Sequence, residues 1–302
     1  MRNLLSSLVL ALSWDAAVLA QPAAPETMTV TAERLSRGTL RAQASRFVRN
    51  VVADTRNGQN ARWFKPICAE TVGVNGEVGR LFTSRIADVA GHVGLKMAQS
   101  GCEPNIVIAF TRDAHLLVKA VNRRQNGALD NLPGPERALL KSTSLPVRWW
   151  HFTSPESVDG KPFSPGPLGL GAWAGALPSE ITYNNNARGS RIDLTSLVGI
   201  TGAVVVVDIE QLGQTSMAAL TDYVALVALA RLRMNPRGRP DGSILAMFDQ
   251  GAPRFDGLTD QDERFIEAMY GSSSAVEGWR QRADMAGRMA DTALGRATTP
   301  RR

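Results

Sequence analysis

The sequence of 302 residues predicts an α/β (α+β) fold in which helices pack on a mixed sheet. Two runs, at 106–110 and 203–209, are rich in β-branched residues and apolar except for Asp208, and they fit strands that are buried on both faces. Apolar residues recur at helical spacing in several segments before, between and after these runs. Strands and helices in this order favour a sheet with helices on its faces.

Residues 1–20 predict a cleaved secretory signal peptide. A positive charge precedes a mostly apolar run from residue 4 to 20, and Val18 and Ala20 suit the small-residue requirement of signal peptidase. Asp15 lies inside this run, which is also short for a membrane span, so an uncleaved anchor is the alternative interpretation. With cleavage after Ala20 and no other stretch long and apolar enough to span a membrane, the expected location is periplasmic or extracellular.

Composition divides the remaining chain into three parts. Residues 21–58 predict a linker followed by an amphipathic helix, whose apolar residues recur at helical spacing between residues 40 and 52. Residues 59–272 predict a single α/β domain. Residues 273–302 predict a weak helix that leads into a flexible basic tail.

The two cysteines lie on either side of one predicted helix, at 76–97. Cys68 ends a short predicted strand at 62–68, whose proline marks an edge or a strand start, and Cys102 precedes a predicted strand at 105–111. A crossover of this length favours parallel neighbouring strands. In an oxidising compartment we expect a Cys68–Cys102 disulfide, with two buried free thiols as the alternative.

A long insertion rich in glycine and proline occupies residues 154–178. Loops of this length are uncommon inside compact domains, so we interpret it either as a flap without a specific task or as a lid over a cleft, with Trp173 as a contact residue. The elements predicted around it are helices at 114–124 and 135–141, a strand at 147–152, and a hairpin of residues 181–183 with 190–192.

The segment 203–271 has a recognisable order of elements. The buried strand is followed by a helix at 216–233 that is apolar over most of its circumference, and then by a Ser-Ile-Leu turn. A second helix begins at Thr259, where Asp262 three positions later completes a variant of the capping box, and it stops at Gly271.

This order resembles the catalytic half of the zincin metallopeptidases. In that family the first helix carries H-E-x-x-H, which places two imidazoles and a general-base carboxylate on the helix. Here Tyr223 and Val227 occupy the histidine positions, Val224 replaces the glutamate, and Arg233 falls where some subfamilies have a third histidine. Valine has no lone pair and arginine stays protonated, so the resemblance implies a zincin-like fold without zinc ligands. An ordinary core helix under a sheet is the alternative.

Three further segments, Ala61–Trp63, Pro66–Cys68 and Cys102–Val107, are similar to uncharacterised secreted bacterial proteins, some of which resemble degenerate zincins. That similarity implies no particular activity.

Other candidates for chemistry are few. The three histidines, His92, His115 and His151, share no metal-ligand spacing, and each is more typical of a structural residue than of a catalytic one. Asp113 and His115 follow the carboxyl end of a strand, where α/β sheets collect functional groups. No nucleophile elbow, phosphate-binding loop or dinucleotide fingerprint accompanies them. We therefore assign no catalytic, cofactor-binding or metal-binding residue, and keep Asp113, His115, His151 and Trp173 as cleft candidates.

The formal net charge is +6, and only five of the 34 basic residues are lysines. Positive charge favours anionic envelope polymers as partners, while the lack of a basic run interleaved with aromatic residues argues against nucleic acid. Three hypotheses remain. The preferred one is a secreted, catalytically inactive zincin-like protein that binds an unknown protein or envelope polymer. The others are a metal-dependent hydrolase or peptidase with non-standard ligands, and a structural protein of the envelope that is held by charge.

Overall fold

The structure is a computed structural model of the chain. It describes residues 36–53, 55, 58–124, 129, 132–142, 145–157, 164–165, 182–183, 194, 196–236 and 240–298. The predicted signal peptide, the linker up to residue 35 and Trp173 lie outside these residues.

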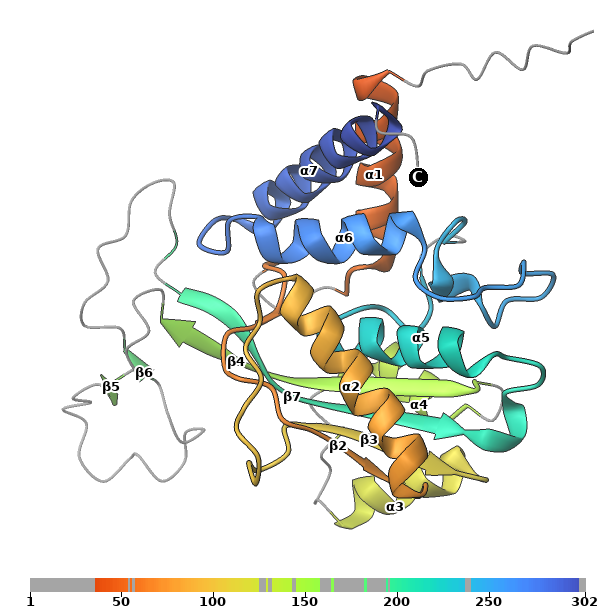
Figure 1. The fold of residues 1–302 in the computed structure, drawn as a ribbon. Coiled ribbons are helices and arrows are strands. Elements are labelled where there is room, and N and C mark those ends of the chain that lie inside the picture. The colour runs from red at the N-terminus through yellow and green to blue at the C-terminus, as the bar shows by residue number, and fades with distance from the viewer. Residues whose placement is uncertain are drawn as a thin grey trace, which may run out of the picture. The chain divides into compact units, whose positions relative to one another are not determined.

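Strand β7 (Ser196–Asp208) is the centre of a five-stranded mixed sheet (Figure 1). Along one side it pairs antiparallel with β4 (Val147–Ser157). Along the other it pairs in parallel with β1 (Arg62–Trp63) near its start and with β3 (Ile106–Thr111) near its end. β2 (Ala69–Val72) extends the sheet parallel to β3. The predicted mixed α/β fold and the parallel strands on either side of one crossover helix are confirmed.

Helices cover both faces of this sheet (Figure 1). The larger core lies between one face and helices α2 (Gly76–His92) and α5 (Met217–Leu229). The smaller core lies on the opposite face, beneath α3 (Ala114–Arg124) and α4 (Gly134–Leu140). Because β7 is packed on both faces, its apolar run shows no polar alternation.

A further layer consists of α1 (Arg37–Val51), α6 (Asp260–Gly271) and α7 (Gly278–Thr298), at the top of Figure 1. The ring of Phe47 meets the ring of Phe265 edge to face at 5.6 Å, and Met285 and Met289 of α7 are buried in the same core. Helix α7 is therefore a 21-residue helix of the main compact unit, residues 35–302, rather than the expected weak helix outside the domain.

Most predicted helices are confirmed, but two boundaries differ for local reasons. The helix expected at 76–97 ends at His92, because Gly94 adopts a φ of +78° and the amide of Leu95 turns back to the carbonyl of Ala90. The helix expected at 216–233 ends at Leu229.

The strands differ more from expectation. Of the strand expected at 62–68, only Arg62–Trp63 form a strand, because regular pairing stops before Pro66; β2 begins at Ala69, beyond the expected bounds. β4 continues to Ser157, inside the insertion expected at 154–178. Among the described residues it pairs only with β7, and proline is tolerated in such an edge strand. Residues Thr182–Tyr183 pair antiparallel with Ser164–Pro165. The partner expected at 190–192 lies outside the described residues, so that hairpin stays a prediction.

The expected disulfide is present. Cys68 and Cys102 are joined across 34 positions of sequence, tying the chain before β2 to the chain before β3. A closed loop of this length stabilises the folded state by about 4 kcal/mol in the chain-entropy treatment. Disulfides persist in oxidising compartments, so the bond is compatible with a periplasmic or extracellular location. Among the described helices, none has the length and apolar character needed to cross a membrane.

Candidate functional site

Helix α5 carries Tyr223, Val224 and Val227, the positions that the resemblance of the sequence to zincins singled out. Ser216 caps its start by accepting a hydrogen bond from the amide of Ala219, and nearly every residue after that is buried. The side chains of Val224 and Val227 are 0 % exposed and Tyr223 is 5 % exposed. The predicted buried helix is thus confirmed, and its apolar circumference is explained by packing on all sides.

Aromatic rings fill the space around Tyr223. Its ring packs edge to face with Trp149 of β4 at 6.0 Å and with Phe248 at 5.2 Å. Burial raises the pKa of the Tyr223 phenol, so this side chain stays neutral. A neutral, buried phenol whose ring packs against two other aromatic rings is a core group.

The carboxyl end of α5 is buried, so its last carbonyl groups need donors from elsewhere. Trp63 and His151 both donate ring N–H groups to the carbonyl of Ala228, at 3.1 and 3.4 Å. The hydroxyl of Tyr270 donates to the carbonyl of Leu229 at 2.6 Å. Side chains from β1, β4 and α6 therefore complete this helix end and fix it against the sheet.

His151 is a structural member of that cap. Burial, together with the positive charge of Arg231, lowers its pKa to about 3. The imidazole is therefore neutral, and the hydrogen bond to Ala228 requires that Nε2 carries the proton. The pKa and the hydrogen bond both explain this histidine without a catalytic role.

The other cleft candidates lie at the start of α3, on the opposite face of the sheet. The carboxylate of Asp113 accepts a hydrogen bond from the amide of Leu116 at 2.8 Å, which caps the helix. Nδ1 of His115 lies 2.7 Å from the carbonyl oxygen of Lys141. The structure does not bring these two residues together with His151, which faces α5 on the other side.

A buried ion pair that sequence reasoning missed lies near the same strand ends. Arg148 and Asp208 approach to 4.0 Å and are both almost fully buried. Asp208 also accepts hydrogen bonds from the amide of Ala114 and the side chain of Gln211. Within the described residues, Oδ1 of Asp208 and Nε and Nη1 of Arg148 make no hydrogen bond. The pair anchors α3 to the sheet, and no solvent reaches those atoms. In the sequence, the only indication of this ion pair was an aspartate at the end of an apolar strand.

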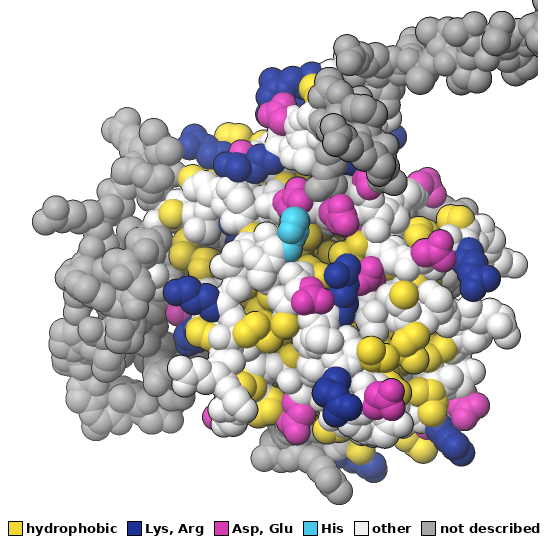
Figure 2. Space-filling model, in the orientation of Figure 1, with side chains coloured by type: hydrophobic (Ala, Val, Ile, Leu, Met, Phe, Trp, Pro, Cys, Tyr) yellow, Lys and Arg dark blue, Asp and Glu magenta, His cyan; other side chains and the backbone are white. Residues whose placement is uncertain are grey.

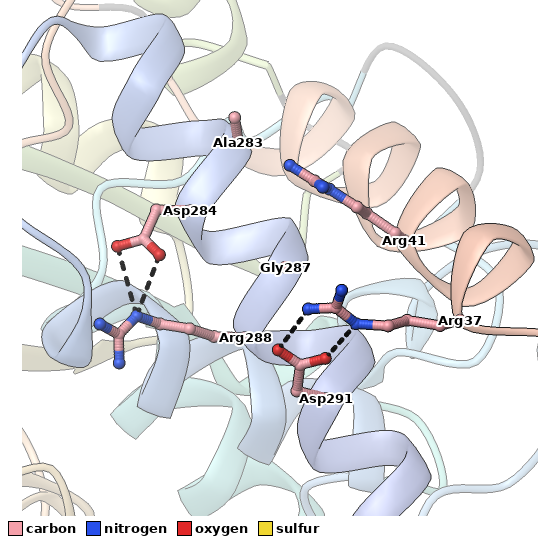
Figure 3. Close-up of a pocket in the computed structure, with 7 residues that line it drawn as sticks. All are labelled: Arg37, Arg41, Ala283, Asp284, Gly287, Arg288 and Asp291. Carbon is pink, nitrogen blue, oxygen red and sulfur yellow. Dashed lines mark hydrogen bonds and ion pairs between the residues drawn. The ribbon is translucent and has the colours of Figure 1, made fainter.

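The second missed feature is a shallow groove of about 450 Å³ between α1 and α7 (Figure 3). Arg37 forms two hydrogen bonds with Asp291, at 2.6 and 2.9 Å, and Arg288 contacts Asp284 at 3.3 Å. Arg41 also lines the groove, and its guanidinium makes no hydrogen bond within the described part of the chain. The signal in the sequence was a pair of arginines four residues apart on a helix without acidic residues.

The charge of the whole protein is concentrated on these two helices. Helix α1 contains four arginines and no acidic residue, while α7 contains four arginines and two aspartates. Their combined formal charge is +6, equal to that of the whole chain, so the rest of the sequence is balanced. Figure 2 shows basic side chains gathered at α1 and α7, acidic side chains over α6, and a mixture of both over the sheet layer.

Within the described residues, no group of three or more histidine, cysteine, aspartate or glutamate side chains is placed to hold a metal ion. Comparison of the chain with known protein families, with curated proteins and with solved structures gave no match.

Proposed function

We propose that this protein is a non-catalytic binding module of the periplasm or the extracellular space, built on a zincin-like domain. The observation that carries the proposal is the burial of Tyr223, Val224 and Val227. A metallopeptidase must present its metal ligands to water and substrate, because the metal activates a bound water. Here the corresponding positions carry an enclosed phenol and two aliphatic side chains.

The order of elements supports the zincin-like part of the proposal. The buried strand β7 is followed by the buried helix α5, a turn at Ser243–Leu245 and the capped helix α6. In the turn, Asp262 accepts hydrogen bonds from the hydroxyl of Ser243 and the amide of Ile244, and so joins the turn to the capping box. Turn and helix are thus one hydrogen-bonded unit packed against α5.

A hydrolase with non-standard ligands receives less support. It would need histidines and carboxylates gathered at one place, whereas His115 and His151 lie on opposite faces of the sheet and bond to backbone carbonyls. A role in charge-based attachment to the envelope is favoured by the concentration of arginine on α1 and α7, and it is compatible with a binding module.

Metal content and proteolysis test the proposal together. We expect purified, untagged protein to contain no stoichiometric divalent ion and to show no proteolysis that a chelator abolishes. A stoichiometric ion that is lost in His115→Ala or His151→Ala protein would instead support the hydrolase.

A restored motif tests the zincin-like geometry separately. We expect Tyr223→His/Val224→Glu/Val227→His protein to be less stable without metal, because polar groups replace core side chains. Zinc should then raise its melting temperature with increasing concentration, since the metal binds the folded state. The matched control, Tyr223→His/Val224→Glu, lacks the second imidazole and should show a much smaller effect. A folded triple variant with no response to zinc would contradict the zincin-like arrangement.

A further inference from the structure

We propose that the groove between α1 and α7 binds the phosphate groups of an anionic phospholipid surface. This surface would be the partner of the binding module proposed above, and the assignment rests on the proposed function only in assuming that the protein is such a module. The chemistry is carried by Arg37, Arg41 and Arg288, which line one depression. Guanidinium groups suit phosphate because their N–H donors match two oxygens at once.

Arg41 is the residue most available to an external anion. Arg37 and Arg288 already contact Asp291 and Asp284, whereas the guanidinium of Arg41 makes no hydrogen bond within the described residues (Figure 3). The floor beneath it is formed by Ala283 and Gly287 of α7, whose small side chains leave the groove open. The two aspartates in the groove compete with an external anion for these donors.

The charge pattern favours an extended anionic surface over a small isolated ligand. Helices α1 and α7 together carry a formal charge of +6, and Arg46 and Arg49, which lie outside the groove, are exposed on α1. A membrane with anionic lipids attracts such clusters through its surface potential, and each arginine near the surface contributes to the attraction.

Trp279 favours a lipid surface over a soluble polyanion. It is 62 % exposed at the start of α7, and Arg280 lies over its ring at 5.1 Å. Trp279 precedes Ala283 by four residues, so it extends the helix face that forms the groove. Tryptophan is favoured at membrane interfaces because its ring is apolar and its N–H is polar. The apolar stripe of α1 packs inward, so contact is confined to the headgroup level.

Vesicle co-sedimentation of the full chain tests this assignment, with phosphatidylglycerol/phosphatidylcholine vesicles compared with pure phosphatidylcholine. We expect binding to the anionic vesicles only, and its loss in high salt. Each arginine near an anionic surface strengthens binding about fivefold. Arg41→Gln should therefore weaken binding about fivefold, and Arg37→Gln/Arg41→Gln/Arg288→Gln should weaken it more than about fiftyfold.

Matched variants separate the groove from general charge. Arg80→Gln/Arg112→Gln/Arg123→Gln removes the same charge from exposed sites outside α1 and α7 and should weaken binding much less. Asp291→Asn removes a competing carboxylate, so it should strengthen binding about fivefold by the same factor. A mere structural role for the Arg37–Asp291 pair predicts the opposite sign. Melting temperatures measured for each variant show whether it is folded.

Several results would overturn the proposal. These are equal losses for the two triple variants, no gain from Asp291→Asn, or equal binding to phosphatidylcholine. Binding of tripolyphosphate, a soluble polyanion, is measured as well. If the protein binds this anion but does not bind the vesicles, the lipid surface is rejected as the partner. Trp279→Ala should weaken vesicle binding and leave tripolyphosphate binding unchanged. None of these measurements depends on metal content, so the binding proposal and the non-catalytic proposal can fail separately.

Discussion

Val227 provides the clearest test of whether α5 is a core helix. It lies in the middle of the helix, is 0 % exposed, and belongs to the larger hydrophobic core. Whether the position belongs to the core or to a cleft therefore decides what a charged side chain there would cost.

We expect Val227→Asp to lower the free energy of unfolding by about 3 to 5 kcal/mol, because an uncompensated charge would be buried. Met217→Asp is the control on the same helix. Met217 is 46 % exposed at the first turn, where an aspartate suits the helix dipole, so its effect should stay within about 0.5 kcal/mol. Urea unfolding measures both. Wild-type stability in Val227→Asp protein would mean that the position is open to water.

His151 gives the protein a predictable dependence on pH. Its pKa in the folded state is about 3, well below the ordinary value of 6.5, because the site is buried. The folded state thus holds a neutral imidazole, while the unfolded chain gains a proton as pH falls below about 6.5. The stabilising contribution is complete above this pH and decreases as pH falls toward the folded-state pKa.

We expect wild-type protein to lose about 2 kcal/mol of unfolding free energy from this group between pH 6.5 and 5.0, at about 1.4 kcal/mol per pH unit. His151→Gln should be less stable at neutral pH but should lack this part of the slope. Subtracting the two curves cancels the titration of all other groups. Parallel curves would show that His151 is accessible to protons in the folded state.

The carboxyl end of α5 illustrates what holds an element in place once its apolar side chains are buried. Its orphan carbonyls are satisfied by Trp63, His151 and Tyr270, which come from three different elements. The apolar periodicity of 216–233 predicted the helix and its burial. It could not predict these donors, because they are brought to the helix end only by the tertiary fold.

Tyr270→Phe tests the contribution of this cap. The substitution removes the donor to the carbonyl of Leu229, so we expect a loss of about 1 to 3 kcal/mol for a buried acceptor left unpaired. Tyr223→Phe is the matched control, because Tyr223 is also buried but its hydroxyl makes no hydrogen bond within the described residues. Its effect on urea unfolding should be close to zero. Equal effects would contradict the assigned role of Tyr270.

The sequence predicted local features better than it predicted contacts between distant segments. The capping box of Thr259 and Asp262 and the bounds of α3 were predicted well, because caps and helical spacing are properties of neighbouring residues. The strand that contains the two-residue β1 was expected to be too long, and the four-residue β2 was not expected, because such short strands are defined by pairing with β7 and β3. The Arg148–Asp208 pair and the α1–α7 groove were missed for the same reason: each joins residues far apart in the chain.

At the scale of the whole molecule, the largest departure from expectation is the extent of the folded unit. The sequence suggested a domain at 59–272, with a helix before it and a weak helix after it. In the structure α1 and α7 pack against each other and on α6, and their residues Phe47, Met285 and Met289 are buried with Phe265. The first and the last helix of the described residues are thus part of the main core.

Truncation follows directly from this arrangement. We expect a chain of residues 36–298 to unfold cooperatively in urea, whereas a chain of residues 59–272 should bind a hydrophobic dye and lose its sharp transition. Removing α1 and α7 exposes the apolar face of α6, and with it one side of the core that holds α5. It also removes Gln281, which bonds the amide of Asn60 just before β1. A stable fragment 59–272 that unfolds cooperatively would show that α1 and α7 are not needed for the fold of the remaining domain.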